Sequence, residues 1–190
     1  IASPNNYTQR YLYRSKLDGS GQSERISPSD LAGQHSYQIS NDAKYAIHRF
    51  ENATTPPRIS LINLTAHREI KLLEDNSALK IKMNKLALRS KEFFRVDIGD
   101  VVLDAWMIKP KNFDPQKKYP LLVHVYGEPA GSTVQDNWGT GDNLWHQYLA
   151  NELGCIVMSI DNRGTRVPRG REFRKCIYRQ IGLLAADDQS

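Results

Sequence analysis

Large apolar residues alternate with polar ones in several short runs within residues 1–75. One pair of runs, HSYQIS and KYAIHRF, is separated by Asn-Asp at 41–42, and another, RISLINL and REIKLL, by Thr-Ala-His at 65–67. An alternation with a period of two predicts strands, and the short polar segments between the runs predict turns. An earlier run, RYLYRSKL, ends in the hairpin signal Asp-Gly-Ser-Gly at 18–21. The pattern therefore predicts an antiparallel meander.

The regular succession of strand and turn in this half is typical of a β-propeller blade. A meander this short exposes unpaired strand edges and needs neighbouring blades beside it. We therefore expect residues 1–75 to form the C-terminal part of a β-propeller and the chain to be a piece of a longer protein.

The pattern changes to helical spacing in NSALKIKMNKLAL, residues 76–88. Leu79, Met83 and Leu86 fall on one face of this helix, with lysines on the other, and Asn76 is suited to the N-cap. We predict a linker helix, and we assign residues 76–90 to the connection between two domains.

From residue 91 the chain reads as an α/β domain. EFFRVDI and VVLDAWMIKP are expected to form a hairpin over Gly99-Asp100, and LLVHVYG is a nearly continuous apolar run, typical of a strand buried on both faces. A predicted helix, DNLWHQYLANELG, places Leu144, Tyr148 and Leu149 on one face and ends at Gly154.

A second buried strand, CIVMSIDNRG, and a further helix, REFRKCIYRQIG, follow this first helix. The order strand, helix, strand, helix is that of a doubly wound sheet. The predicted fold class is thus all-β followed by α/β, with residues 91–190 as the N-terminal part of the second domain.

Composition and charge bear on whether the chain binds nucleic acid or a membrane. The net charge is +5 and the pI about 9.2, but the basic residues are dispersed except over residues 163–179. No aromatic stacking module or helix-turn-helix accompanies that segment, so we expect no nucleic-acid partner. No apolar run approaches the ~18 residues of a membrane span, so no membrane contact is expected. Of the two cysteines, Cys155 is expected in the core and Cys176 half-buried on a helix.

The first candidate chemical group stands at the end of the LLVHVYG strand. Tyr126-Gly127-Glu128-Pro129 is a tight turn at the carboxyl end of a strand, where α/β enzymes place their catalytic groups. A tyrosine hydroxyl stays protonated at neutral pH, so it can donate a hydrogen bond to an oxyanion. The alternative is a tyrosine that caps the edge of the sheet.

The second strand ends in Asp-Asn-Arg-Gly at 161–164. Arg163 in this turn either anchors the loop through ion pairs or directs its guanidinium toward a substrate. Both interpretations remain open from the sequence.

A nucleophile is missing from the pattern. No G-x-S-x-G elbow occurs, Ser132 lacks one, and Ser159 lies within a strand. The five histidines are scattered over strands and a helix and do not suggest a triad. Metal-ligand spacing is absent, and Gly19-Ser20-Gly21 is a hairpin turn rather than a phosphate loop, so we expect neither a metal nor another cofactor.

Taken together, these segments resemble one family. YGEP, DNRGT and RGREFRK at these separations, with LEDNSALKIKMNKLAL before them and DDQ after them, are similar to the dipeptidyl peptidase IV branch of the prolyl oligopeptidase serine peptidases. SPNNYTQRYLYRSKLDGSG is similar to a late propeller blade of that family. The resemblance covers nearly the whole chain in order.

The resemblance implies a β-propeller capping an α/β-hydrolase domain, and a complete protein that releases N-terminal dipeptides from peptides after proline or alanine. Only Tyr126 maps to a catalytic role, that of oxyanion donor. The catalytic Ser, Asp and His of the family lie beyond Ser190, and its paired glutamates lie upstream of Ile1, so we expect this chain alone to be inactive. The resemblance also implies peptide substrates and a periplasmic or secreted location, and it is compatible with a homodimer.

The sequence departs from the family pattern at Glu128, where a small residue is usual, and at Arg166 and Val167, where a glycine is common. A carboxylate near an oxyanion donor disfavours developing negative charge. Two alternatives therefore stay open: an acylaminoacyl or tripeptidyl peptidase, and a non-catalytic binding protein on a decayed hydrolase fold.

Overall fold

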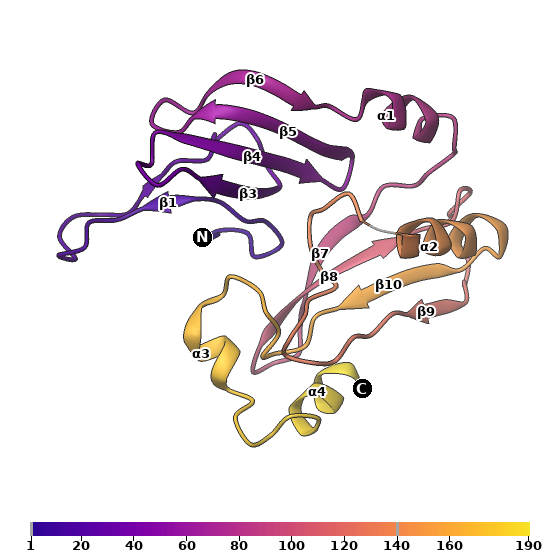
Figure 1. Cartoon of the computed structure of the whole chain (residues 1–190). Coiled ribbons are helices and arrows are strands. Elements are labelled where there is room, and N and C mark those ends of the chain that lie inside the picture. The colour runs from indigo at the N-terminus through magenta and orange to yellow at the C-terminus, as the bar shows by residue number, and fades with distance from the viewer. Residues whose placement is uncertain (1, 140) are drawn as a thin grey trace. The chain divides into compact units, whose positions relative to one another are not determined.

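The computed structural model describes residues 2–139 and 141–190, and the chain divides into two compact units (Figure 1). The N-terminal unit comprises residues 1–86 together with 136–138. The C-terminal unit comprises residues 87–135 and 139–190.

The N-terminal unit is built on a four-stranded antiparallel sheet whose strands follow one another in sequence order (Figure 1). Its strands are β3 (Gln34–Ile39), β4 (Tyr45–Asn52), β5 (Thr55–Asn63) and β6 (Arg68–Glu74). A separate two-stranded ribbon pairs β1 (Tyr13–Arg14) with β2 (Glu24–Arg25). The four strands predicted from alternation are confirmed, whereas the RYLYRSKL run forms only the short strand β1.

Alternation in β4 corresponds to alternating burial. Ala46, His48 and Phe50 are buried, and the alternate residues Tyr45, Ile47 and Arg49 are exposed. The edge strand β6 is exposed along its whole length.

Helix α1 (Ser77–Met83) lies within the predicted helical segment but is shorter than that segment. Asn76 occupies the N-cap position in a left-handed conformation, with φ of 53°. Its side chain makes no capping hydrogen bond because its Nδ2 instead donates to the Pro57 carbonyl at 2.7 Å. The predicted capping role of Asn76 is therefore wrong, and no residue of α1 is buried.

The C-terminal unit contains a mixed four-stranded sheet with the order β7-β8-β10-β9. The strands are β7 (Glu92–Asp97), β8 (Val102–Ile108), β9 (Leu121–Val123) and β10 (Ile156–Ile160). The predicted hairpin of β7 and β8 is confirmed, and β8 also pairs antiparallel with β10. Only β9 and β10 are parallel, with α2 (Gly141–Glu152) between them in sequence. Two short helices, α3 (Gly170–Lys175) and α4 (Leu183–Gln189), follow β10.

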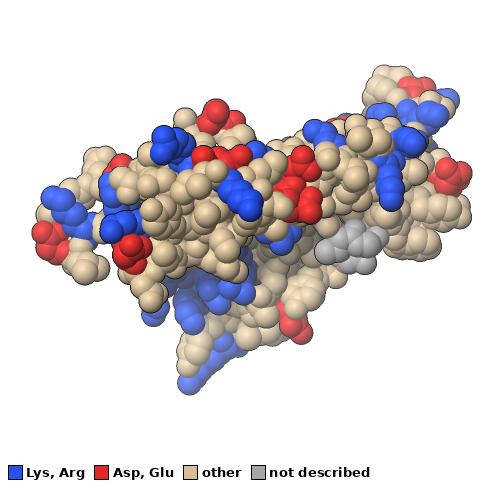
Figure 2. All heavy atoms as spheres, turned by 45° about the horizontal axis from the view of Figure 1, so that its top comes forward, with Lys and Arg blue, Asp and Glu red and all other residues tan. Residues whose placement is uncertain are grey.

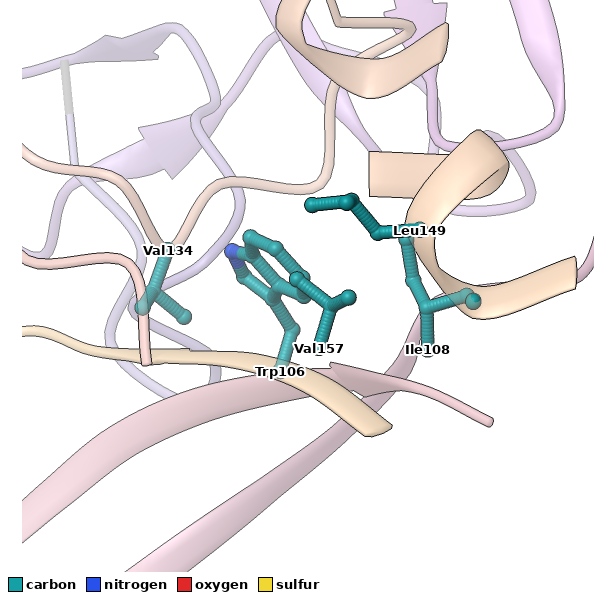
Figure 3. Packing of buried hydrophobic residues seen from close by; sticks show 6 residues of the cluster. Trp106, Ile108, Val134, Leu149 and Val157 are labelled. Atoms are coloured by element: carbon teal, nitrogen blue, oxygen red, sulfur yellow. The ribbon is translucent and has the colours of Figure 1, made fainter. Parts of the chain in front are cut away.

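Apolar side chains from β8, β10, α2 and the loop after β9 form the core of this unit (Figure 3). The cluster consists of Trp106, Ile108, Val134, Leu149, Ala150 and Val157. Trp106 is 2% exposed, and its indole N–H donates to the Thr133 carbonyl at 2.9 Å. The largest core side chain thereby also fixes the loop after β9.

Helix α2 packs through a different face from the one predicted. Leu149 is buried, but Leu144 and Tyr148 are 45% and 50% exposed. The buried face contains His146, Leu149 and Ala150, which follow the i, i+3, i+4 spacing of a helix. The polar ring of His146 lies on this face and packs against Trp106, with ring centroids 5.4 Å apart and ring planes tilted by 44°.

Strand β9 is exposed rather than buried on both faces. Leu121, Leu122 and Val123 are 57%, 36% and 45% exposed. The prediction fails because β9 is the edge strand of its sheet in this chain and pairs with β10 alone. The strand also ends at Val123, earlier than the apolar run suggested.

The surface charge, the two cysteines and the lengths of the helices complete the description of the fold. Figure 2 shows lysine and arginine side chains interspersed with acidic and uncharged residues on the face drawn. Cys155 is partly buried just before β10 rather than in the core as predicted, and Cys176 is exposed at the end of α3 rather than half-buried. Within residues 2–139 and 141–190, none of the helices has the length and apolar character needed to cross a bilayer.

Candidate oxyanion-donor loop

Tyr126 lies three residues beyond the end of β9, in the loop that returns toward the core at Val134. Its side chain is 52% exposed, so its hydroxyl can reach a bound molecule. Gly127 has φ of 78°, a conformation that glycine adopts without the steric cost of a β-carbon. The local sequence therefore turns the chain directly after the tyrosine.

The start of this loop is attached to β10 through a buried serine. Ser159 is fully buried, and its hydroxyl donates to the His124 carbonyl at 2.5 Å. The Ser159 hydroxyl oxygen also lies 2.6 Å from Thr133 Oγ1. Ser159 thus connects the two ends of the loop.

The end of the loop is attached to Asp161, which immediately follows β10. The Asp161 carboxylate accepts hydrogen bonds from the Ser132 hydroxyl, from the Thr133 amide at 2.8 Å and hydroxyl at 3.0 Å, and from the Val134 amide at 3.3 Å. The residue is 4% exposed. Burial raises the pKa of Asp161, and these hydrogen bonds act in the opposite direction.

These contacts also define the role of Ser132. Its hydroxyl is bound to a buried carboxylate, which makes it a loop anchor rather than an activated nucleophile.

The turn at 162–164 completes the end of β10. Asn162 is 3% exposed, and its Nδ2 donates to the Arg163 carbonyl at 3.1 Å and reaches the Gly127 carbonyl at 3.5 Å. Gly164 has φ of 86°, and a β-carbon there would lie 2.7 Å from the Ile177 side chain. Glycine is therefore required at 164 for both conformation and packing.

Arg163 lies within a network of carboxylates. Its Nε donates to Asp188 Oδ1 at 2.8 Å, its Nη2 lies 2.6 Å from the same carboxylate, and its Nη1 lies 2.7 Å from Asp100 Oδ2. The Arg163 side chain is 15% exposed and that of Asp188 is fully buried. Hydrogen bonds from Arg163 lower the pKa of Asp100, and those to Asp188 and Asp100 raise the pKa of Arg163. This geometry joins β10, α4 and the β7–β8 turn.

The histidines form separate groups. His124 and His146 lie in the C-terminal unit with ring centroids 5.0 Å apart. His35, His48 and His67 lie together in the N-terminal unit. Within the described parts of the chain, no group of three or more His, Cys, Asp or Glu side chains is arranged to hold a metal ion.

Sequence reasoning placed Tyr126 and Arg163 at neighbouring strand ends but missed Asp161, Ser159 and the Ser132-Thr133 pair. An acidic residue directly after a buried strand, with two hydroxyl residues after the glycine-rich turn, was the available signal. The pattern could not show that the carboxylate is directed back to the preceding loop rather than to solvent.

The whole chain is similar in sequence and structure to known peptidases. No family model matches the chain. Among curated proteins, it is 34% identical to "Probable dipeptidyl-aminopeptidase B" of Coccidioides posadasii over 191 residues, which cover 100% of this chain and 20% of that protein. It is also 35% identical to "Prolyl endopeptidase FAP" of Bos taurus over 122 residues, which cover 64% of this chain and 16% of that protein.

Among solved structures, dipeptidyl peptidase 4 of Porphyromonas gingivalis matches with a TM-score of 0.84 and 32% identity, over 96% of this chain and 25% of that one. The chain is homologous to members of the prolyl oligopeptidase family of peptidases. Within that family it is homologous over its whole length to proteins of the dipeptidyl peptidase IV type. It spans about a fifth to a quarter of the length of these relatives.

Proposed function

We propose that the complete protein to which this chain belongs is a serine exopeptidase that releases N-terminal dipeptides, of the Xaa-Pro or Xaa-Ala type, from peptides. The observation that carries this proposal is homology over the whole chain to proteins named as dipeptidyl peptidases, with 32–34% identity and a TM-score of 0.84. Peptides are the proposed partners, and a periplasmic or secreted location and a homodimer are proposed by analogy with the family.

We assign the fold of the complete protein in the same way. The sheet β3–β6 is proposed as a blade at the end of a β-propeller, and α1 as part of the linker. The sheet β7-β8-β10-β9 is proposed as the first part of an α/β-hydrolase domain. The antiparallel meander supports the first assignment, and the parallel pair β9–β10 connected through α2 supports the last.

The proposed contribution of this chain to catalysis is the Tyr126 hydroxyl. The phenol is a hydrogen-bond donor at neutral pH, it is half exposed, and it follows a strand that belongs to a parallel pair. A donor directed at the oxyanion of a tetrahedral intermediate stabilises the transition state by about 3 kcal/mol. Because no nucleophile elbow occurs in the sequence, the isolated chain is expected to have no peptidase activity.

Arg163 is proposed to fix the turn after β10. Its guanidinium already contacts two carboxylates, so binding a substrate carbonyl or carboxylate would require it to give up part of this network. A substrate role for Arg163 therefore predicts a change in KM on substitution, whereas anchoring predicts a loss of stability.

The test uses the protein expressed from its complete reading frame, with the 190-residue chain as the matched control. We expect the complete protein to hydrolyse Gly-Pro-p-nitroanilide and to be labelled by a fluorophosphonate, and the isolated chain to do neither. Hydrolysis of acylated or tripeptide substrates in place of Gly-Pro would favour the related exopeptidases. Absence of both hydrolysis and labelling in the folded complete protein would contradict the proposal and support a decayed binding protein.

Glu128 offers a further check on the decayed-site alternative. Its side chain is exposed in the turn after Tyr126, so its charge is screened by solvent. Replacing it with glutamine in the complete protein is expected to raise kcat by no more than about threefold, since an exposed charge contributes little.

A further inference from the structure

We propose that Asp161 and Gly131 are positioning residues for Tyr126: Asp161 fixes the returning segment of the loop, and Gly131 in that segment supports the tyrosine ring. This inference rests on the proposed role of Tyr126 as oxyanion donor. It adds the reason why a half-exposed side chain in a loop would be held in one orientation.

The first step is the contact between Gly131 and the ring. A β-carbon added at Gly131 would lie 2.7 Å from Tyr126 Cε1 and 3.2 Å from both Cδ1 and Cζ. The ring therefore lies directly on the backbone of Gly131, a position that only glycine permits. Gly131 is also the one glycine of this loop whose φ does not itself require glycine, so the constraint at 131 is the space taken by the ring.

The second step is the anchoring of Gly131. On its carboxyl side, Ser132, Thr133 and Val134 all donate to the Asp161 carboxylate. The Gly131 carbonyl itself accepts from the Arg166 amide at 3.2 Å. A buried carboxylate that accepts several hydrogen bonds from consecutive residues fixes their backbone strongly, because each lost bond leaves a buried polar group unpaired.

The third step connects the anchor to the sheet. The Asp161 amide donates to the Asp104 carbonyl at 3.0 Å, which extends the pairing of β10 with the central strand β8. The amino side of Tyr126 is held by the same strand, since Ser159 donates to the His124 carbonyl. The segments before and after Tyr126 are thus both hydrogen-bonded to residues at the end of β10.

The consequence for catalysis is geometric. A displacement of a catalytic group by about 1 Å reduces the rate by about 10²-fold, and removing one oxyanion donor reduces it by about 10²- to 10³-fold. A methyl group at 131 is expected to displace the ring rather than the backbone, because the Tyr126 side chain is half exposed whereas the Gly131 carbonyl is held by the Arg166 amide.

The experiment is a double-mutant cycle in the protein expressed from its complete reading frame, with Gly-Pro-p-nitroanilide as substrate. Gly131→Ala is expected to lower kcat by about tenfold or more with KM changed by less than about twofold, because the displaced hydroxyl acts in the transition state. Tyr126→Phe is expected to lower kcat by about 10²-fold. In the Tyr126→Phe background, Gly131→Ala is expected to have no further effect, since the group that it displaces is absent.

Asp161→Asn is expected to lower kcat in the same non-additive way, because the amide replaces one acceptor oxygen with a donor. Ser132→Ala is the graded control, which removes only one of the bonds to the carboxylate and is expected to have a smaller effect than Asp161→Asn. If Asp161→Asn does not fold, the Gly131 cycle alone decides the proposal, since the added methyl group leaves the anchoring hydrogen bonds in place.

The outcomes separate the two claims. A large effect of Tyr126→Phe with an unchanged kcat for Gly131→Ala would overturn the positioning role and leave the donor role intact. Equal losses from Gly131→Ala with and without the Tyr126→Phe substitution would also overturn it, because they would show that the glycine acts on something other than the tyrosine hydroxyl. No effect of Tyr126→Phe in an active protein would overturn both.

Discussion

The two sheets of this chain differ in the polarity of the side chains that they bury. The sheet β7-β8-β10-β9 covers its inner face with aliphatic side chains and one tryptophan (Figure 3). The sheet β3–β6 buries His35 and His48 beside Phe50 and Ile62, and the half-buried Tyr37 stacks on His48. The first is stabilised by removal of apolar surface from water, and the second also depends on every buried polar atom finding a partner.

The hydrogen bonds of this histidine cluster determine one protonation state. His35 Nε2 lies 2.9 Å from the Leu31 carbonyl, which can only accept, so this nitrogen carries the proton. Neutral His35 then accepts through Nδ1 from His48 Nε2, 2.9 Å away. Tyr37, stacked on His48 with ring centroids 4.6 Å apart, contacts His67 Nε2 through its hydroxyl at 2.8 Å. The arrangement fits neutral rings, and a proton added to His35 Nδ1 would remove the acceptor for His48 Nε2 and break this pairing.

The largest expected effect lies in the apolar sheet. Trp106→Ala removes the largest core side chain, which is 2% exposed, together with its hydrogen bond to Thr133. We expect the free energy of unfolding of the C-terminal unit to fall by about 4 kcal/mol, from lost transfer energy and the cavity. Hydrogen exchange followed by mass spectrometry should show faster exchange in β8 and β10 and unchanged exchange in β3–β6. Equal acceleration in both sheets would break the comparison, since it would make the two units one cooperative structure.

A buried ion pair in the C-terminal unit is expected to come next. Asp188→Ala leaves the Arg163 guanidinium without its fully buried partner, which we expect to cost about 3 kcal/mol. Chemical denaturation followed by tryptophan fluorescence measures this loss, and Asp100→Ala is the matched control at the exposed end of the same network. A smaller loss for Asp188→Ala than for Asp100→Ala would contradict the assignment of Arg163 as a buried anchor.

The third expected effect is a dependence of stability on pH in the sheet that contains the histidines. An unfolded histidine takes up a proton near pH 6.5, but burial and the neighbouring His35 lower the pKa of His48 in the folded chain to about 3. Burial lowers the pKa of His35 and His67 as well. The stability that depends on neutral rings is therefore fully present above pH 6.5 and is lost as the pH falls toward 3.

We therefore expect the midpoint for unfolding of the N-terminal unit to fall by about 5 °C or more between pH 7.5 and pH 5, the shift that about 1 kcal/mol produces in a domain of this size. Thermal unfolding monitored by hydrogen exchange in β3–β6 measures it. His48→Gln should flatten the pH dependence, whereas His124→Gln, a substitution in the other unit, should leave it unchanged. A midpoint that is constant across this range would show that the cluster does not control the stability of its sheet.

The smallest effect concerns an exposed ion pair. Arg58 and Glu69 in the N-terminal sheet lie 2.6 Å apart, but their side chains are 45% and 37% exposed. Glu69→Gln is expected to cost about 0.5 kcal/mol, because solvent screens the pair and the amide still accepts from Ser60. The midpoint of urea denaturation measures this loss. A loss as large as that of Asp188→Ala would mean that burial does not explain the difference between the two ion pairs.

The sequence predicted the strands of this chain better than their surroundings. Period-two alternation identified β3 to β6, and the Gly99-Asp100 turn identified the β7–β8 hairpin, because both signals are local. The apolar run at β9 was interpreted as buried, but burial depends on which segments pair beside a strand. The buried face of α2 was predicted wrongly for a similar reason. Helical spacing shows which residues share a face, but it does not show whether the face with the histidine or the face with the leucine packs against the sheet.

The same distinction applies to the candidate site. Tyr126 could be proposed from the sequence because a glycine-rich turn after an apolar strand is a local pattern. The partners of Arg163 were not predictable, since Asp100 and Asp188 lie 63 and 25 residues away in sequence. Asp161 was missed because its role depends on a loop nearly thirty residues earlier, which the fold brings beside it.

The central claim is that Tyr126 provides an oxyanion donor to a dipeptidyl peptidase. The most direct measurement is the kcat of the Tyr126→Phe variant of the complete protein with Gly-Pro-p-nitroanilide. The substitution removes one hydroxyl and keeps the ring that lies on Gly131. We predict a loss of about 10²-fold in kcat with little change in KM. An unchanged kcat in a variant of undiminished stability would contradict the account.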